Sequence, residues 1–321
     1  MSSESSESGK LLALSLYKPA WQYYIKYERF LTELNHPFRS RVDFVSDEKM
    51  VLEEKDILSY KAIVFFHHDP LKQLYPEAYE YAKRIEAICD RNGICFLNRP
   101  DALSTSAKSV QLGLLAKSGF NVAEAKTFKT WEELLSDKDR NYPLFVRYEY
   151  GHDSLGEAVS GPFFSLDEVA KAEPWRRDKW FKKEHFDGLV AIEWKDTRSA
   201  DGYFRKYRVF VFGDTVMHGQ LQISNHWFVH SNNAFKEECF QKETVGFLLG
   251  DCSSNEKEVF LKVNKALGLD FSAVDYSFSK DGKIIVWEAN PHPSLGEWAE
   301  HEPFKTQFTN SLSAFYNSQI E

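Results

Sequence analysis

The first hundred residues alternate between short apolar runs and amphipathic stretches. Runs rich in β-branched and aromatic residues predict buried strands, and stretches with apolar residues every three or four positions predict helices. The predicted strands cover 11–17, 41–45, 61–68 and 93–98, and the predicted helices cover 21–34 and 76–91. Strands that alternate with helices in this way favour a parallel sheet covered on both faces. We therefore predict an open α/β lobe over residues 11–104.

The pattern changes after residue 104. A helix at about 106–117 leads into a small α+β unit, and beyond Gly188 the chain reads mostly as strand, with a helix at about 256–267 before a final hairpin. The predicted domains are a disordered tail at 1–10, the N-terminal lobe at 11–104, a lid lobe at 105–187 and a C-terminal mixed-sheet lobe at 188–321. The predicted fold class is therefore α/β with several lobes.

Composition narrows the classes of function. A chain of 321 residues with 43% hydrophobic content can bury a sizeable core. Its net charge of -8, with no basic block, argues against nucleic acid as a partner. No apolar run approaches the roughly 20 residues that span a bilayer, and the polar start MSSESSESGK is unlike a secretory signal. We expect a cytoplasmic protein that acts on small molecules and does not enter a membrane.

The four cysteines have no Cys-x-x-Cys spacing and no accompanying His pair, so we interpret them as reduced thiols and not as a zinc site.

Residues 272–290 carry the strongest chemical signal in the chain. They read as two strands joined at Asp281-Gly282, a dipeptide typical of a tight hairpin turn. The pairs that follow from a turn centred there are Lys280 with Lys283, Ser277 with Val286 and Asp275 with Glu288. The opposite face carries apolar residues that would fix the register against a core: Val274, Tyr276, Phe278, Ile285 and Trp287.

Three oxygen-bearing side chains converge at one end of this predicted hairpin. Asn290 shares a face with Glu288 because side chains alternate along a strand, and Asp275 lies opposite Glu288. Two facing carboxylates at ~5 Å repel by about 3 kcal/mol at an effective dielectric of ~20, so a positive group should lie between them. Carboxylate and amide oxygens suit Mg²⁺. A surface hairpin whose acids face water is the alternative.

These two strands resemble the metal motif of the ATP-grasp superfamily, in which an Asp on one strand is followed by Glu-x-Asn on the next, here VDYSF and WEANPHP. The resemblance covers roughly residues 98–295. It implies the ATP-grasp fold, ATP and Mg²⁺ as ligands, and a nucleotide site between the lid and C-terminal lobes.

Further segments follow in the order of that family. NRPDALSTSAKSV resembles the stretch that starts a helix with a phosphate-binding lysine, which implies this role for Lys108. YPLFVRYEYGHDSLGEAV resembles the strand and loop that cover the triphosphate, which implies phosphate binding by Arg147 and by a loop of small residues. The loop residues concerned are Gly151, Ser154 and Gly156. The family usually has Lys in place of Arg147, and Arg keeps the charge.

Two more segments complete the resemblance. FKKEHFDG resembles the hinge between the two nucleotide-gripping lobes, so Glu184 and Phe186 are expected to read the adenine edge. KYRVFVFGDTVMHG resembles a strand-turn-strand that aims an Arg into the site, which makes Arg208 the candidate for binding the transferred phosphate or the reacting carboxylate. A surface salt bridge is the alternative for Arg208. Some relatives carry Arg at the position of Ala273, and Arg208 would then take over its work.

The resemblance implies an ADP-forming ligase that joins a carboxylate to an amine through an acylphosphate. Two alternatives stay open: a kinase-like relative that stops at phosphoryl transfer, and a nucleotide-binding module without turnover. The sequence names neither the carboxylate nor the amine, because a fold does not settle a substrate.

Overall fold

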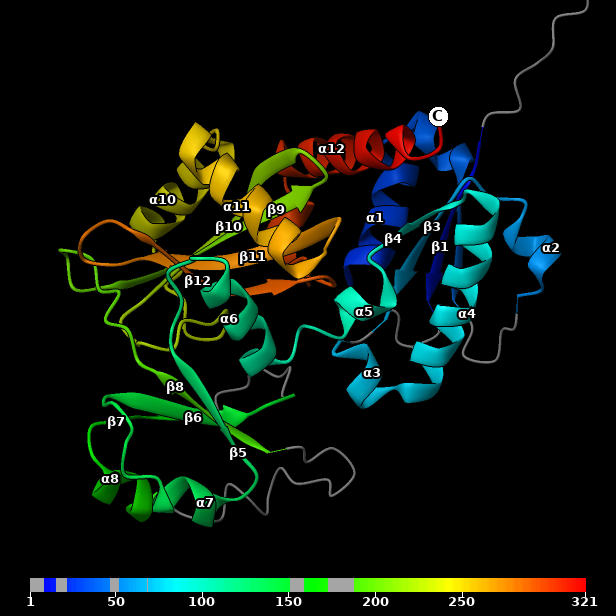
Figure 1. The fold of residues 1–321 in the computed structure, drawn as a ribbon. Coiled ribbons are helices and arrows are strands. Elements are labelled where there is room, and N and C mark those ends of the chain that lie inside the picture. Colours follow the sequence, from blue (N-terminus) through cyan, green and yellow to red (C-terminus); the bar gives the residue numbers. More distant parts are fainter. Residues whose placement is uncertain (1–8, 16–21, 47–51, 68, 151–158, 173–187) are drawn as a thin grey trace, which may run out of the picture.

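The computed structural model describes residues 9–15, 22–46, 52–67, 69–150, 159–172 and 188–321. Three four-stranded sheets dominate these residues, one in each of the three parts visible in Figure 1. The tail predicted at 1–10 falls almost entirely outside the described residues. Among the described residues, no helix is both long and apolar enough to cross a membrane.

The N-terminal sheet is parallel and has the strand order β2-β1-β3-β4. Its main elements are β1 (Leu11–Ser15), α1 (Gln22–Glu33), β2 (Val42–Ser46), β3 (Ala62–Phe66), α4 (Pro76–Asn92) and β4 (Cys95–Leu97). Alternate residues enter two different cores, Leu11 and Val64 on the side of α1, and Leu12 and Ile63 on the side of α4. Both faces are buried, which is why these strands read as continuous apolar runs.

Short helices complete the connections of this lobe. They are η1 (Pro37–Arg41), α2 (Glu54–Ile57), α3 (Leu71–Leu74) and α5 (Pro100–Leu103).

The C-terminal helix α12 (Phe304–Ser318), which the sequence analysis did not predict, packs between the first and third sheets. The Phe308 ring lies 5.1 Å from that of Phe210 in the third sheet. On the other side, the hydroxyls of Tyr27 and Ser313 share a hydrogen bond of 2.9 Å. The helix therefore joins the N-terminal lobe to the lobe of the third sheet, although its residues fall within the range predicted for the C-terminal lobe.

The lid sheet is antiparallel and has the order β5-β8-β6-β7. Its elements are β5 (Ala125–Phe128), α7 (Trp131–Ser136), β6 (Leu144–Tyr148), β7 (Val159–Phe163), α8 (Leu166–Lys171) and β8 (Leu189–Glu193). The predicted boundary at residue 188 is wrong for β8, which pairs with both β5 and β6. The sequence shows the strand but not its partners, because pairing is decided by tertiary contacts.

The third sheet is antiparallel, with the order β10-β9-β11-β12. Its strands are β9 (Phe204–Phe212), β10 (Thr215–Ser224), β11 (Phe271–Phe278) and β12 (Ile284–Asn290), and its helices are α10 (Glu238–Leu249), which was not predicted, α11 (Ser254–Leu267) and the 3-10 turn η3 (Glu297–Glu300).

The edge strand β12 is covered by helix α6 (Lys108–Lys117). The Gln111 amide donates to the Ala289 carbonyl at 2.9 Å and accepts from the Ala289 N–H at 2.8 Å. This double hydrogen bond fixes the start of α6, and with it Lys108, beside the hairpin.

The β11–β12 hairpin forms as predicted, but its turn differs. The Ser279 N–H donates to the Lys283 carbonyl at 2.8 Å, which closes a three-residue loop with Gly282 at a φ of 76°. A positive φ at the last loop position is typical of glycine in such turns. The partner of Ser277 is therefore Ile285, one residue from the predicted one.

A β-bulge restores the predicted register farther along the hairpin. The pairing shifts by one residue at Trp287, so that Asp275 faces Glu288 as predicted. Val286 takes the core position beside Tyr276. The prediction that Trp287 shares the face of Tyr276 is wrong, because the bulge turns it toward the other face, where it lines the cavity and packs against buried residues such as Ile192.

Candidate active site

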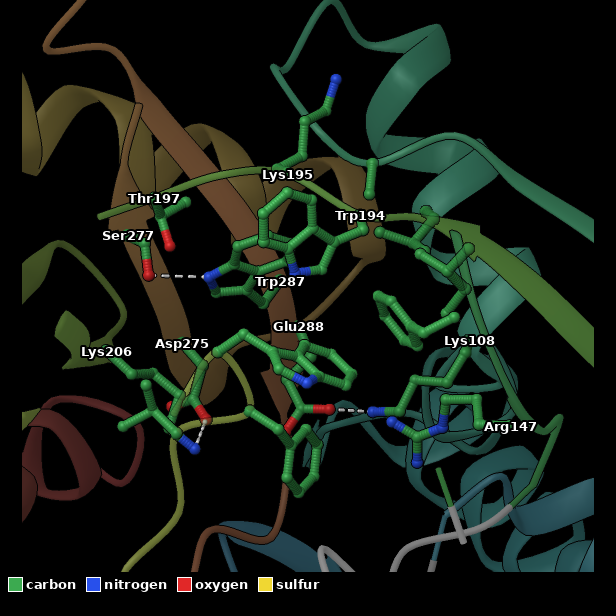
Figure 2. Close-up of a pocket in the computed structure, with 17 residues that line it drawn as sticks. Lys108, Arg147, Trp194, Lys195, Thr197, Lys206, Asp275, Ser277, Trp287 and Glu288 are labelled. Carbon is green, nitrogen blue, oxygen red and sulfur yellow. Dashed lines mark hydrogen bonds and ion pairs between the residues drawn. The ribbon is translucent and has the colours of Figure 1, made fainter. Parts of the chain in front are cut away.

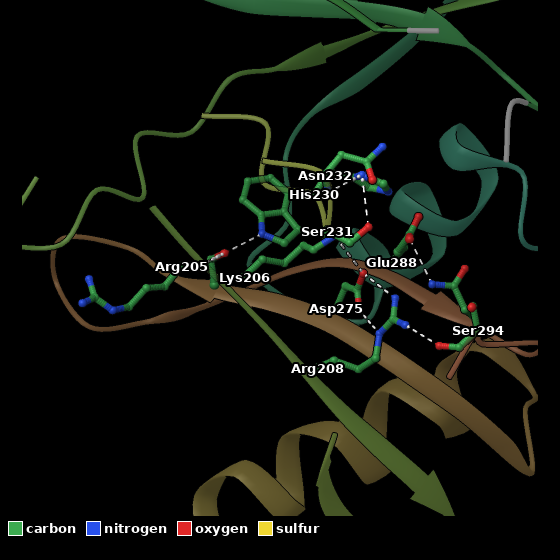
Figure 3. A network of polar contacts seen from close by, with 12 residues as sticks. Arg205, Lys206, Arg208, His230, Ser231, Asn232, Asp275, Glu288 and Ser294 are labelled. Atoms are coloured by element: carbon green, nitrogen blue, oxygen red, sulfur yellow. Dashed lines mark hydrogen bonds and ion pairs between the residues drawn. The ribbon is translucent and has the colours of Figure 1, made fainter. Parts of the chain in front are cut away.

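A charged row crosses the third sheet. Arg208 of β9, Asp275 of β11 and Glu288 of β12 are direct neighbours on adjacent strands. The Arg208 Nε donates to Asp275 Oδ1 at 2.5 Å and its Nη2 donates to Oδ2 at 2.9 Å, as Figure 3 shows. Lys206 Nζ lies 3.6 Å from the same carboxylate. Two cations therefore neutralise Asp275, whose side chain is almost fully buried.

Glu288 has its own cations. Lys108 forms an ion pair with Glu288 (Figure 2). The Asn290 amide donates to Glu288 Oε1 at 2.9 Å. Arg147 lies on the same side of the cavity, on lid strand β6. Burial acts to raise the pKa of Glu288, but the charges of Lys108 and Arg147 outweigh it and hold the pKa well below its usual range. The carboxylate is thus ionised in the folded protein at neutral pH.

Burial acts to lower the pKa of both Arg147 and Arg208, but the net shifts have opposite directions. Desolvation lowers the pKa of Arg147, although Glu288 and Glu149 act in the opposite direction. Desolvation also acts on Arg208, but its contacts with Asp275 raise the pKa above the ordinary value. Both guanidiniums are kept in a weakly solvated site, where a phosphate group would be a strong partner.

These residues form one part of a cavity between the lid sheet and the third sheet. We call Lys108, Arg147, Lys206, Asp275 and Glu288 the charged cluster. The remaining lining includes five aromatic residues, which we call the aromatic wall: Phe145, Trp194, Trp227, Phe228 and Trp287. Trp287 is fixed by its indole N–H, which donates to Ser277 Oγ at 2.9 Å (Figure 2).

The chain passes from the lid to the third sheet along this cavity. Strand β8 ends at Glu193, and the residues that follow it, Trp194 and Lys195, line the cavity. The sequence analysis assigned the hinge to Glu184 and Phe186, which lie outside the described residues. The sequence does show the strand that leads into this connection, β8 with Trp194 after it, but the sequence analysis assigned that strand to the C-terminal lobe.

The predicted phosphate-loop residues Gly151, Ser154 and Gly156 also lie outside the described residues.

Two further contributors complete the site. Lys206, which sequence reasoning missed, approaches Asp275. The segment after β10 folds back over the cavity, and the ring centroid of its Trp227 lies 5.4 Å from that of Phe145 in the lid. The Asn233 side chain holds this segment in place, donating to the Phe228 carbonyl at 2.7 Å. Aromatic and polar residues directly after a strand, HWFVHSNN, are the sequence signal for this segment.

The donor set at the hairpin fits a magnesium ion. Asp275, Glu288 and Asn290 present carboxylate and amide oxygens from one end of two paired strands, and oxygen ligands are those that Mg²⁺ takes. Both carboxylates pair with cationic side chains, so a bound metal ion would share these acids with Lys108 and Arg208. The residues present are therefore suited to a hard divalent cation.

No protein-family model matches the chain, and no curated protein matches it. Solved structures do match over nearly the whole chain. The VanG D-Ala:D-Ser ligase from Enterococcus faecalis aligns with a TM-score of 0.59 at 14% identity, covering 96% of this chain and 99% of that one. The chain has the ATP-grasp fold.

Other ATP-grasp structures align equally well. The ATP-grasp ligase PsnB complexed with minimal precursor aligns with a TM-score of 0.57 at 12% identity, over 96% of this chain and 99% of that one. The D-cycloserine synthetase DcsG aligns with a TM-score of 0.58 at 14% identity, over 95% and 99%. Such low identity establishes the fold, and the chemistry has to be argued from this chain's own residues.

Proposed function

We propose that this ATP-grasp protein is an ATP- and magnesium-dependent ligase that joins a carboxylate to an amine through an acylphosphate. The observation that carries the proposal is the pair of facing carboxylates, Asp275 and Glu288, which line a cavity between two sheets together with Lys108 and Arg147. Arg208 binds Asp275, and Lys108 binds Glu288. A module that only bound nucleotide would have little reason to keep two opposed acids at a cost in stability.

The two parts of the cavity suit the two ends of a nucleotide, the aromatic wall the base and the charged cluster the phosphates. The aromatic wall offers ring faces for stacking a base. Glu184 and Phe186 stay our proposed readers of the adenine edge, and the backbone at Lys195, which follows the end of β8 along the cavity, is a further candidate. Lys108 and Arg147 would bind the phosphates, with Gly151, Ser154 and Gly156 as loop partners.

Asp275, Glu288 and Asn290 would hold magnesium, which neutralises charge on the phosphates when bound. Arg208 is our candidate for the cation that stabilises the transferring phosphoryl group. In that step a carboxylate oxygen attacks the γ-phosphorus, the bond to the bridging oxygen breaks, and ADP leaves. The amine nitrogen then attacks the acyl carbon, releasing phosphate and a proton. Arg208 would contribute by position and charge alone.

The acceptor pocket is proposed at the carboxyl ends of β1 and β3. The connections from these two neighbouring strands lead in opposite directions across the sheet, and such switch points are where open α/β sheets bind ligands. His67 follows β3 there, and its backbone N–H donates to His292 Nε2 at 3.0 Å. Since His292 lies two residues after Asn290, this contact connects the switch point to the proposed metal strand.

The test is an ADP-release screen of the wild-type protein with ATP and Mg²⁺ against amino acids and small carboxylic acids. A ligase releases ADP and phosphate in step with a new amide. With a stimulating acid in hand, hydroxylamine should trap the acylphosphate as a hydroxamate even when the amine is left out. A stable phosphate ester without hydroxamate would make the protein a kinase, and ATP binding without ADP release under any of these conditions would make it a binding module.

A further inference from the structure

Helix α6, which begins with the proposed phosphate-binding Lys108, lacks a cap of its own. Its N-cap residue is Ala107, whose side chain cannot accept a hydrogen bond, and its first turn contains no acidic residue. The first N–H groups of a helix need acceptors from elsewhere, and a negative charge near them is favourable.

The missing cap comes from the lid. Glu149 directly follows lid strand β6, and its Oε1 accepts hydrogen bonds from the Ser109 N–H at 3.0 Å and the Ser109 hydroxyl at 2.5 Å. Only 5% of Glu149 is exposed, so this is a buried carboxylate at the start of a helix that lies 40 residues away in the chain.

The same carboxylate acts on a second cation. Its negative charge opposes the effect of burial on the pKa of Arg147, as does the charge of Glu288. Lys108 pairs with Glu288 and is the residue next to Ser109. Glu288 therefore acts on both Lys108 and Arg147, while Glu149 acts on Arg147 and holds Ser109, the residue next to Lys108.

Glu288 attracts both Lys108 and Arg147. Glu149 offers Arg147 a second negative charge and anchors the backbone next to Lys108, and both cations line the cavity. The other oxygen of Glu149, Oε2, makes no hydrogen bond to any residue that the structure describes. An incompletely satisfied buried carboxylate costs stability, which argues for a role beyond capping.

We propose that Glu149 is a positioning residue that holds Lys108 and Arg147 in the arrangement that grips the nucleotide phosphates. The inference rests on the proposed nucleotide site. Glu149 also couples the lid to α6, because it caps the helix and directly follows the strand that carries Arg147.

The experiment is a double-mutant cycle on ATP affinity, measured with Mg²⁺ by calorimetry and, for weak variants, by displacement of a fluorescent ATP analogue. Glu149→Gln keeps an oxygen that can accept both Ser109 hydrogen bonds but removes the charge. In the wild-type background it should weaken ATP binding about tenfold. In a Lys108→Gln background the loss should be clearly smaller, because only one of the two cations that Glu149 positions, Arg147, remains.

Ser109→Ala is the matched control. It removes one donor to Glu149 but leaves the carboxylate and the backbone hydrogen bond, so ATP affinity should stay within about twofold of wild type. Thermal unfolding of each variant shows that it is folded. Unchanged ATP affinity in Glu149→Gln, or the same loss in both backgrounds, would overturn the inference. Failure of the folded wild-type protein to bind ATP would instead overturn the proposed function.

Discussion

The charged cluster and the aromatic wall occupy one cavity but are held in place in different ways. Each acid of the charged cluster is fixed by partners from other segments: Asp275 by Arg208 from the next strand, and Glu288 by Lys108 from α6. The aromatic wall is assembled from rings on separate segments, with Trp227 resting on Phe145 across the cavity. Charged groups in a weakly solvated site need counterions held at fixed positions, whereas aromatic rings need only complementary packing.

Substitutions of the two carboxylates or their partners should therefore mainly lower the rate of the reaction. Substitutions in the aromatic wall should mainly lower the affinity for ATP.

The largest effect is expected from Glu288→Gln. The variant loses a proposed metal ligand and the partner of Lys108, so ADP release should fall at least about a hundredfold. Glu258→Gln, which alters an exposed carboxylate paired with Lys262, is the control and should turn over normally. Wild-type turnover by Glu288→Gln at limiting Mg²⁺ would remove this residue from the metal site.

Arg208→Ala, which removes the partner of Asp275, should separate chemistry from binding. Trapping by hydroxylamine should fall about a hundredfold while ATP affinity changes only a few fold, since the proposed charge is needed at the transferring phosphoryl group. The control is Arg205→Ala on the same strand, because Arg205 pairs with Asp201 and Glu243 outside the cavity. Equal losses of affinity and trapping in Arg208→Ala would show that it serves ground-state binding.

Trp287→Leu tests the aromatic wall. Loss of one stacking surface should weaken ATP binding about tenfold, while hydroxamate formation at saturating ATP should stay near the wild-type rate. Trp287→Phe keeps a ring and loses only the hydrogen bond to Ser277, so it should bind ATP nearly as well as wild type. A drop in the saturated rate of Trp287→Leu would indicate that the bulge also positions Glu288.

The smallest effect is a pH dependence of stability. The pKa of Glu288 in the folded protein is held below its ordinary value of 4.5, so its contribution to stability is complete above pH 4.5 and is lost as the pH falls toward the folded pKa. The free energy of unfolding of wild type, relative to Glu288→Gln, should therefore decline below pH 4.5. Denaturant titrations of both proteins at several pH values measure this difference. A constant difference would mean that Glu288 is not held by its cations in solution.

The β11–β12 hairpin shows how much of the structure could be predicted from the sequence. The Asp281-Gly282 turn predicted that Asp275 faces Glu288, and this pairing is confirmed. The reasoning contained two omissions that cancel: the loop holds one residue more than a two-residue turn, and the bulge at Trp287 shifts the register back. Neither is visible in a pattern of alternating residues, because turn length and bulges depend on how the strands twist against the sheet.

The sequence by itself determined the elements whose signals are local. Buried apolar runs predicted the parallel N-terminal sheet, and motif order pointed to the ATP-grasp fold, which the solved structures bear out. Tertiary structure alone decided which segments meet: β8 in the lid sheet, Trp194 and Lys195 along the cavity, Lys206 beside Asp275, and Glu149 at the start of α6. These contacts join residues far apart in the chain, and their energies depend on burial and on neighbouring charges that exist only once the lobes have packed.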